Sequence, residues 1–433
     1  MNILDIIAAK RDGQILTPEQ IAILVHDAVN GRARDYQIAA WLMAAYIRGL
    51  NPAETTALTK EMARSGRELD LSSLPKPWID KHSTGGVGDK TSIVVLPMLA
   101  AAGLTVVKMS GRGLGITGGT IDKLSSVPGF RFDLSPDQLI EQARDIGIAL
   151  TGQTSDLAPA DKVFYALRDS TATVDSIPLI VSSILSKKIA GGSNVIAIDV
   201  KCGSGAFMKT LPEARQLADA LIETAEACGL KLGVEITDMS QPLGRAVGNA
   251  LEIEEAISVL KGTEAGRFRE LCIGLCALAI QECGRATSHN EALLASGDLL
   301  DSGKALLKAK EWFSSQGADP AVFDNPFEVL PRAPVIHCEI YAGPDAWVRS
   351  WDAATVGHAS VELGAGRIRK EDTIDPSVGI LSFIHVGSKI VNGDRLFEVH
   401  AKSQESALPV TRQLLSAIEL SESPVEEVPL FLS

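Results

Sequence analysis

The pattern of hydrophobic and polar residues changes twice along the chain. Up to about residue 66, apolar residues recur at helical spacing and form one helix face after each of two capping starts, Thr17 and Asn51, both followed by proline. No group of residues with evident chemistry interrupts this part. We therefore predict a small helical domain over residues 1–66.

After a short linker, strands and helices alternate. Apolar runs at 104–108, 149–152, 195–200 and 231–236 have the length of strands, and stretches of helix length separate them. This alternation is typical of a mixed, mainly parallel sheet that helices cover on both faces. We predict an α/β domain over residues 78–330.

Beyond about residue 330, the pattern changes to short β-rich segments with glycine turns. Asn392-Gly393 is a strong signal for a hairpin turn. We predict a β-rich α+β domain over residues 331–433. The predicted fold class is therefore α/β with a separate all-helical domain and a β-rich C-terminal domain.

Composition limits the possible partners. The chain has 433 residues, enough for two or three domains, and its formal net charge of -13 argues against a nucleic-acid partner. No apolar run approaches the ~20 residues of a membrane helix, and no secretory leader is visible, so we expect a cytoplasmic protein with no membrane partner. Cys272, Cys276 and Cys283 have the spacing of a buried helix stripe, which favours core cysteines over a zinc site.

Two glycine-rich turns lie close together in the chain. Each follows a predicted strand and precedes a predicted helix, so its backbone N–H groups point at one spot, which attracts an anion. The first turn, residues 81–89, is accompanied by Lys81, Ser83 and Ser92, and the second begins at Ser110. Neither turn matches the Walker pattern or the dinucleotide fingerprint. We predict two adjacent phosphate-binding turns without a nucleotide fold.

A second candidate group lies between residues 162 and 188. Ser183 and Lys187 are four residues apart on a predicted helix and share one side of it, and Arg168 lies on the preceding helix. These residues could form a solvated basic face or a three-point contact to a polar planar ligand. Spacing alone favours the solvated face.

The strings KHSTGGVGD and KMSGRGLGITGGTIDKL resemble the pyrimidine nucleoside phosphorylase and thymidine phosphorylase family, and the similarity continues over most of the chain. The resemblance implies that residues near 163–190 complete the helical domain. It also implies that Arg168, Ser183 and Lys187 hold a pyrimidine ring through O2, N3 and O4. A homodimer through the helical domain is a further implication.

The family's plan places the base on the helical domain and the phosphate on the α/β domain. The cleft between them would close during catalysis. Hinges are expected near residues 71–77, 158–161 and 191–193, which are rich in proline, glycine or small polar residues.

The resemblance implies reversible phosphorolysis of a pyrimidine nucleoside by inorganic phosphate. His82 is expected to protonate O2 of the leaving base, and with Arg168, Ser183 and Lys187 it forms the expected catalytic group. Lys108 resembles the broad-specificity members, so uridine, thymidine and deoxyuridine are expected substrates. The residues expected to bind phosphate are Lys81, Ser83, Ser92, Lys108, Ser110 and Thr120.

The family also implies a potassium ion, held by backbone carbonyls of Gly88, Leu243 and Ala246 and by Glu255. Position 90 is a threonine in some members and Lys90 here. A carboxylate run on a helix is normally exposed surface, but our hypothesis is that the Lys90 ammonium replaces the ion and pairs with Glu255. No organic cofactor is expected.

One departure from the family concerns Ile116, which occupies a position where relatives commonly carry histidine. We expect the wall near the base or sugar to be more apolar as a result.

Two other interpretations stay open. An anthranilate-type phosphoribosyltransferase shares the helical and α/β plan, but it would need an acidic pair for magnesium, which we do not find at the glycine turns. A non-catalytic nucleoside-binding or signalling protein would bind its ligand without phosphate-dependent release of the base.

Overall fold

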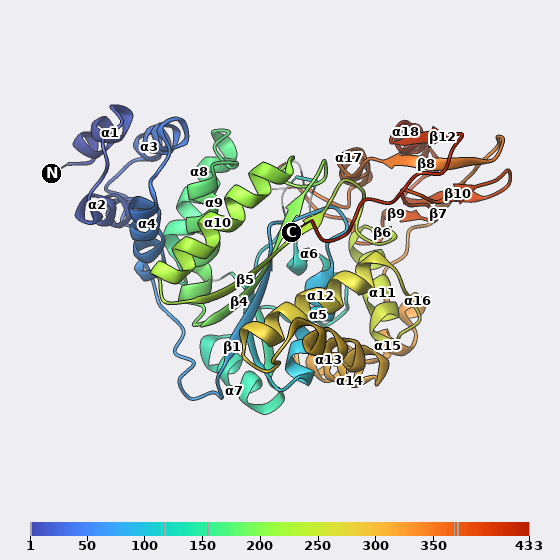
Figure 1. Cartoon of the computed structure of the whole chain (residues 1–433), viewed down its shortest axis with the longest axis horizontal. Coiled ribbons are helices and arrows are strands. Elements are labelled where there is room, and N and C mark those ends of the chain that lie inside the picture. Colours follow the sequence, from blue (N-terminus) through green and yellow to red (C-terminus); the bar gives the residue numbers. More distant parts are fainter. Residues whose placement is uncertain are drawn as a thin grey trace.

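The computed structural model describes residues 2–113, 115–116, 118–153, 156–367, 369 and 372–432. Four residues of predicted loops lie outside this description. They are Leu114 and Thr117 of the predicted glycine turn at 110–120, and Thr154 and Ser155 of the predicted polar loop at 153–162. Figure 1 shows a helical domain at one end, a central α/β domain and a small β-rich domain at the other end.

The helical domain is built from two separate parts of the chain. Thr17 and Asn51 cap their helices as predicted, each with a capping box. Trp41 stacks on Phe164 with ring centroids 6.1 Å apart, so a helix from beyond residue 158 shares the core of the first four. The six helices are α1 (Ile3–Arg11), α2 (Pro18–Val29), α3 (Asp35–Arg48), α4 (Pro52–Arg64), α8 (Pro159–Ser170) and α9 (Ile177–Ala190).

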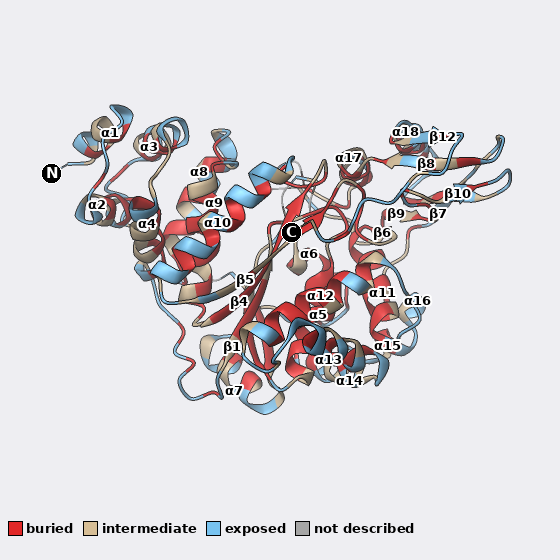
Figure 2. Ribbon diagram, in the orientation of Figure 1, coloured by how far each residue is buried: buried red, intermediate tan, exposed pale blue. Residues whose placement is uncertain are grey.

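The central sheet has five strands in the order β3-β2-β1-β4-β5. All four neighbouring pairs are parallel, so this sheet is wholly parallel and not mixed. β4 is buried at all eight positions, because helices cover both faces of the sheet (Figure 2). The strands are β1 (Trp78–Ser83), β2 (Thr105–Ser110), β3 (Ile148–Gly152), β4 (Val195–Cys202) and β5 (Lys231–Asp238).

The two faces of the sheet have separate cores. Val106 and Val195 pack with one set of helices, and Val107 and Ile196 face the opposite side. The first set comprises α5 (Thr91–Ala101), α11 (Asn249–Leu260), α12 (Arg267–Glu282), α13 (His289–Asp301) and α14 (Lys304–Ser315). On the other face lie α7 (Pro136–Ile146) and α10 (Leu211–Ala227), together with α9.

The C-terminal domain contains two antiparallel sheets. One has the order β6-β9-β11-β7 and the other β10-β8-β12. β6 (Ala246–Val247) belongs to the α/β part of the chain and pairs with β9, so the two domains share a sheet. The remaining strands are β7 (Val335–Ile340), β8 (Ala346–Trp351), β9 (Gly379–Ser382), β10 (Lys389–Ile390), β11 (Arg395–Ala401) and β12 (Ile418–Ser421).

Five further helices complete the elements. Two belong to the C-terminal domain, α17 (Ala353–Leu363) and α18 (Gln404–Ser416). Three are short: α6 (Thr120–Leu124), α15 (Ala321–Asp324) and α16 (Pro326–Val329). Among the described residues, none of the helices combines the length and the apolar character that crossing a membrane requires.

Candidate active site

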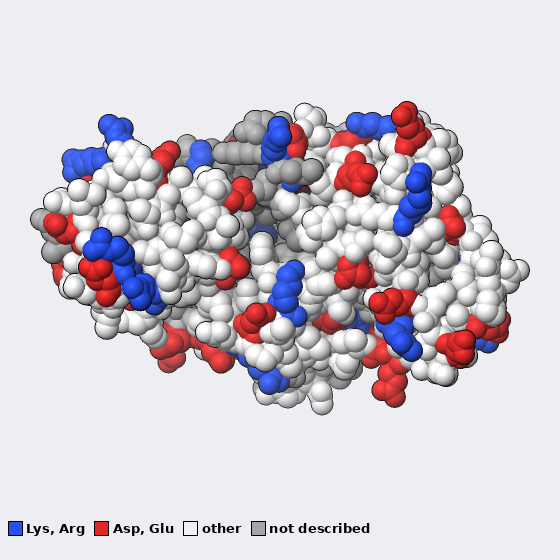
Figure 3. Space-filling view, turned by 90° about the horizontal axis from the view of Figure 1, so that it is seen from above, with Lys and Arg blue, Asp and Glu red and all other residues white. Residues whose placement is uncertain are grey.

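A cavity of about 1080 Å³ separates the helical domain from the carboxyl ends of β1 and β2. Ligands of parallel sheets bind outside this edge, where successive strands end side by side. Figure 3 shows the surface hollowed near its middle, between the helical domain and the rest of the molecule. The predicted site residues should therefore line this cavity.

Five of the six residues that we expected to bind phosphate line the α/β side of this cavity. They are Ser83, Ser92, Lys108, Ser110 and Thr120. Lys81 does not line it: the residue is 1 % exposed, and its Nζ donates a hydrogen bond to Thr91 Oγ1. Lys81 therefore supports the first glycine turn at the start of α5.

An acidic residue that sequence reasoning did not include also lines the cavity. Asp89 Oδ1 accepts hydrogen bonds from the Thr91 hydroxyl at 2.6 Å and from the Thr91 backbone N–H at 3.1 Å. Burial raises the pKa of Asp89, but the charges of Lys81 and Lys201 outweigh burial and hold the pKa well below its usual range. The carboxylate stays ionised and is compensated by the lysines behind it.

Lys108 belongs to a buried cluster of two lysines around one aspartate. Its Nζ donates to Asp80 Oδ1 at 3.0 Å and to the Lys81 carbonyl at 2.5 Å, and Lys188 Nζ donates to Asp80 Oδ2 at 2.6 Å. Burial lowers the pKa of Lys108 to about 7, because desolvation and the neighbouring lysines outweigh the attraction of Asp80. Lys108 therefore changes charge near neutral pH.

The residues Arg168, Ser183 and Lys187, here called the base-side residues, meet on the helical side of the cavity. Lys187 Nζ donates to Ser183 Oγ at 2.9 Å and to Asp161 Oδ2 at 2.6 Å. The Arg168 guanidinium is held by three backbone carbonyls, those of Thr173, Val174 and Leu179. Arg168 is only 2 % exposed, so these residues do not form the solvated face that spacing alone favoured.

His82 lines the cavity at the carboxyl end of β1. Its pKa lies well below the ordinary value, because burial and then the charges of Lys188, Lys108 and Lys187 disfavour a protonated ring. At neutral pH the imidazole is neutral. The expected protonation of O2 by His82 is therefore not favoured at neutral pH, and the ring can instead offer a hydrogen bond from a neutral N–H.

Three of the four residues of the implied potassium site, all except Gly88, contact the Lys90 ammonium. Lys90 Nζ lies 2.6 Å from Glu255 Oε2, 2.6 Å from the Leu243 carbonyl and 3.0 Å from the Ala246 carbonyl. The Lys90 side chain is fully buried. The carboxylate and carbonyl oxygens at this place would suit a monovalent cation. The Lys90 ammonium already occupies the position between them, so a potassium ion does not fit beside it. Glu255 is 7 % exposed, not at the surface as carboxylate runs usually are.

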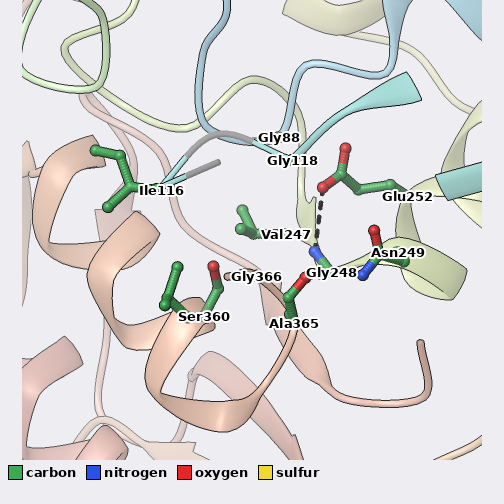
Figure 4. A pocket seen from close by; sticks show the side chains of 12 residues that line it. Gly88, Ile116, Gly118, Val247, Gly248, Asn249, Glu252, Ser360, Ala365 and Gly366 are labelled. Carbon is green, nitrogen blue, oxygen red and sulfur yellow. Dashed lines mark hydrogen bonds between the residues drawn. The ribbon is translucent and has the colours of Figure 1, made fainter. Parts of the chain in front are cut away.

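Sequence reasoning also missed several cavity-lining residues from distant parts of the chain. These are Arg112, Tyr165, Lys188, Phe207 and Arg367. Arg112 is part of the quoted glycine turn and could have been suspected, whereas Arg367 lies in the C-terminal domain and gave no signal. Ile116 does not line this cavity; it borders a small separate one beside α17, so the structure does not support a more apolar wall of the main cavity at this residue (Figure 4).

Comparisons with known proteins match this architecture. Residues 4–66 match the helical bundle domain of a glycosyl transferase family, and residues 75–306 match its a/b domain. Residues 347–421 match the pyrimidine nucleoside phosphorylase C-terminal domain. A pyrimidine-nucleoside phosphorylase from Geobacillus stearothermophilus is 45 % identical over 426 residues, covering 98 % of each chain. This chain belongs to the pyrimidine-nucleoside phosphorylase family.

Other similarities agree with membership of this family. A pyrimidine-nucleoside phosphorylase from Staphylococcus epidermidis is 46 % identical over 405 residues, which cover 94 % of this chain and 93 % of the relative. Among solved structures, the anthranilate phosphoribosyltransferase of Thermus thermophilus aligns with a TM-score of 0.61 at 19 % identity. That alignment covers 72 % of this chain and 99 % of the other, and at this identity it shows a shared fold only.

Proposed function

We propose that this protein catalyses the reversible phosphorolysis of pyrimidine nucleosides. The substrates would be uridine, thymidine and deoxyuridine, and the products a free base and α-D-ribose 1-phosphate or its 2-deoxy form. The observation that carries the proposal is one cavity with hydroxyl groups and Lys108 on its α/β side and the base-side residues opposite. The relatives named pyrimidine-nucleoside phosphorylase support the same reaction.

The chemistry follows from where charge develops. An oxygen of hydrogen phosphate bonds to C1′ as the bond from C1′ to N1 breaks, with the electron pair staying on the base and the phosphate proton passing to it. The sugar becomes cationic beside the phosphate, and the base becomes anionic beside Arg168 and Lys187. Pre-placed charges of this kind stabilise a transition state more than the ground state, with one donor worth ~3 kcal/mol.

In this proposal, His82 acts as a neutral hydrogen-bond donor to O2 of the departing base. A neutral ring fits its lowered pKa, and the positive charge near the base comes from the lysines around it. The cavity volume of about 1080 Å³ lies just above the ~300–1,000 Å³ usual for ligand clefts, which supports closure around a nucleoside and a phosphate together.

The test is an assay for free base with uridine, thymidine, adenosine and AMP, each with and without inorganic phosphate. We expect base release from uridine and thymidine only when phosphate is present. An additional arm offers anthranilate with phosphoribosyl pyrophosphate, the substrates of the other enzyme class that shares this fold. Turnover in that arm alone, or nucleoside binding without any base release, would contradict the proposal.

The Lys90 ammonium, in our proposal, takes the place of the family's potassium ion. Support comes from its three short contacts to Glu255, Leu243 and Ala246. Activity and thermal unfolding should then be the same in potassium and in tetramethylammonium buffers. The variant Lys90→Thr removes the ammonium and should acquire a potassium-dependent melting temperature. Activity of the unaltered protein that is lost in tetramethylammonium and restored by potassium would refute this.

The assembly and location belong to the same proposal. A homodimer through the helical domain is supported by exposed apolar side chains on α3, among them Tyr36 and Ile47, which are 73 % and 68 % exposed.

A cytoplasmic location is supported by the six cysteines, all of which are free.

A further inference from the structure

We propose that Arg367 of the C-terminal domain is a positioning residue that holds Gly113 and Gly115 of the second glycine turn in place and so supports phosphate binding. This inference rests on the proposed function and adds a residue to it. Arg367 lies just after α17 and lines the main cavity, although the C-terminal domain supplies few other residues there. Its side chain is 10 % exposed.

The guanidinium of Arg367 reaches the turn through Asp122. Arg367 Nη1 lies 3.0 Å from Asp122 Oδ1 and 3.4 Å from the carbonyl of Gly113, and its Nε donates to the Asp372 carbonyl at 3.1 Å. Asp122 is almost fully buried and also accepts from the Gly113 N–H at 2.6 Å. Arg112 approaches the same carboxylate oxygen at 3.2 Å, but this arginine is 52 % exposed. Of the two arginines that contact Asp122, Arg367 is therefore the buried one.

The backbone makes a second connection at the same place. The Gly115 N–H donates to the Arg367 carbonyl at 3.0 Å, and these two residues form an isolated antiparallel bridge. A Cβ on Gly366 would come within 3.2 Å of the Gly115 carbonyl, and a Cβ on Gly357 of α17 within 3.0 Å of Ile116 Cβ. The glycines thus let the turn approach the C-terminal domain closely (Figure 4).

The contacts of Arg367 should affect phosphate binding, because Ser110 and Thr120, two of the expected phosphate-binding residues, are the two ends of this turn. Ser110 ends β2, Thr120 begins α6, and both line the cavity. The turn between them is rich in glycine, which has little conformational preference of its own. Contacts to the turn therefore help to fix the distance between the two hydroxyl groups, and some come from Asp122 and Lys123 of α6. Arg367 provides such contacts with its side chain and with its backbone carbonyl.

The experiment uses the full-length variants Arg367→Met and Arg332→Met. Arg332 makes a comparable ion pair from the C-terminal region, 2.6 Å from Glu254 Oε2 on α11, but it does not line the cavity. Steady-state kinetics with uridine and inorganic phosphate give kcat and the KM value for each of these two substrates. The rise in melting temperature on adding inorganic phosphate reports binding independently of turnover.

We expect Arg367→Met to raise KM for phosphate on the order of tenfold, less than the hundredfold cost of a ~1 Å misplacement at the reacting atoms. The phosphate-induced thermal shift should shrink in parallel, with kcat and KM for uridine within about twofold of wild type. Arg332→Met should change neither phosphate measurement.

The inference is overturned if folded Arg367→Met keeps the wild-type KM and thermal shift for phosphate, or if Arg332→Met loses them equally. Should Arg367→Met not fold, Arg367→Lys decides: lysine keeps the charge but lacks the planar fork, so KM for phosphate should still rise. A wild-type KM in Arg367→Lys overturns the inference. A wild-type protein that shows a phosphate thermal shift but no base release would instead contradict the proposed function.

Discussion

At the scale of single residues, the cavity of this acidic protein is lined by cations that carboxylates hold in place. Asp80 lies between Lys108 and Lys188, and Asp161 holds Lys187. A buried charge is costly unless it is paired and hydrogen-bonded. Among the described residues, seven lysines and arginines but five aspartates line the cavity, so the site is locally basic although the chain carries a net charge of -13.

Lys108 should make phosphate binding depend on pH. Its pKa of about 7 means that the ammonium is charged below neutral pH and loses its charge as the pH rises. We therefore expect KM for phosphate to rise between about pH 7 and pH 9. Because phosphate itself ionises in this range, the measurement is the ratio of KM values for wild type and Lys108→Arg, whose guanidinium stays charged. A ratio that does not change with pH would show that Lys108 does not titrate in this range.

Lys187 should matter for the base and not for phosphate. Its Nζ is held by Ser183 and Asp161 on the helical side of the cavity. We expect Lys187→Met to lower kcat/KM for uridine by about a hundredfold, the usual cost of removing one donor to a developing negative charge. KM for phosphate serves as the internal control and should change by less than about threefold. Equal losses for both substrates would point to general distortion of the site.

The sequence predicted those site residues that belong to a local pattern. Ser83 and Ser110 end adjacent strands, as the order of strands and turns indicated. Ser183 and Lys187 share one side of a helix as their spacing indicated, but their place at the cavity came from the resemblance. Arg367 contacts Gly113 across 254 positions of sequence, which no local pattern can indicate. The lowered pKa of His82 could not be predicted from the sequence either, since it depends on burial and on lysines that only the fold brings together.

At the scale of elements, α11 joins the two glycine turns. Glu255 pairs with Lys90, which precedes α5, at 2.6 Å, and Glu252 pairs with Lys123 of α6 at 3.3 Å. Both glutamates are buried, unlike the exposed carboxylates usual on a helix, and the predicted pairing of Lys90 with Glu255 is confirmed. Spacing of three residues puts both on one helix face. The helix therefore sets the position of one turn relative to the other.

Gly244 tests how tightly the contact between α11 and Lys90 is packed. It has φ of +72°, and a Cβ there would overlap the Glu255 carboxylate and lie 2.9 Å from Lys90 Nζ. Gly262→Ala is the matched control, because Gly262 has φ of +73° with nothing within 4 Å of its Cβ. The control should lose ~1–2 kcal/mol of unfolding free energy from backbone strain alone. Gly244→Ala should lose more, by ~1–3 kcal/mol for overpacking, measured by urea unfolding. Equal losses would mean that the ion pair moves aside at no cost.

At the scale of the whole molecule, the cavity lies between parts of the chain that are far apart in sequence. The helical domain receives α8 and α9 from the middle of the chain, and α9 also packs on the central sheet, so the base-side residues lie where the two domains meet. Alternation of strands and helices indicated the parallel sheet from sequence. That residues near 163–190 return to the helical domain came from the resemblance alone, because an amphipathic pattern does not say which core a helix joins.

The same helical domain offers the surface through which we propose that two chains associate. Tyr36, Ala40, Met43 and Ile47 are exposed at i, i+4, i+7 and i+11 along α3 and so share one helix face. An exposed apolar stripe of this kind is typical of an interface. We expect the wild-type protein to sediment as a dimer and Ile47→Glu to sediment as a monomer at the same concentration, because the charge would be buried without a partner.

Leu307→Glu is the control for this experiment. Leu307 of α14 is as exposed as Ile47, at 68 %, but lies in a different region of the molecule (Figure 1). This variant carries the same change of charge and should remain a dimer in analytical ultracentrifugation. No residue of α3 is among the described lining of the cavity, so the Ile47→Glu monomer should still release base from uridine. A wild-type monomer, or an Ile47→Glu variant that stays dimeric, would rule out this face of α3 as the contact between subunits.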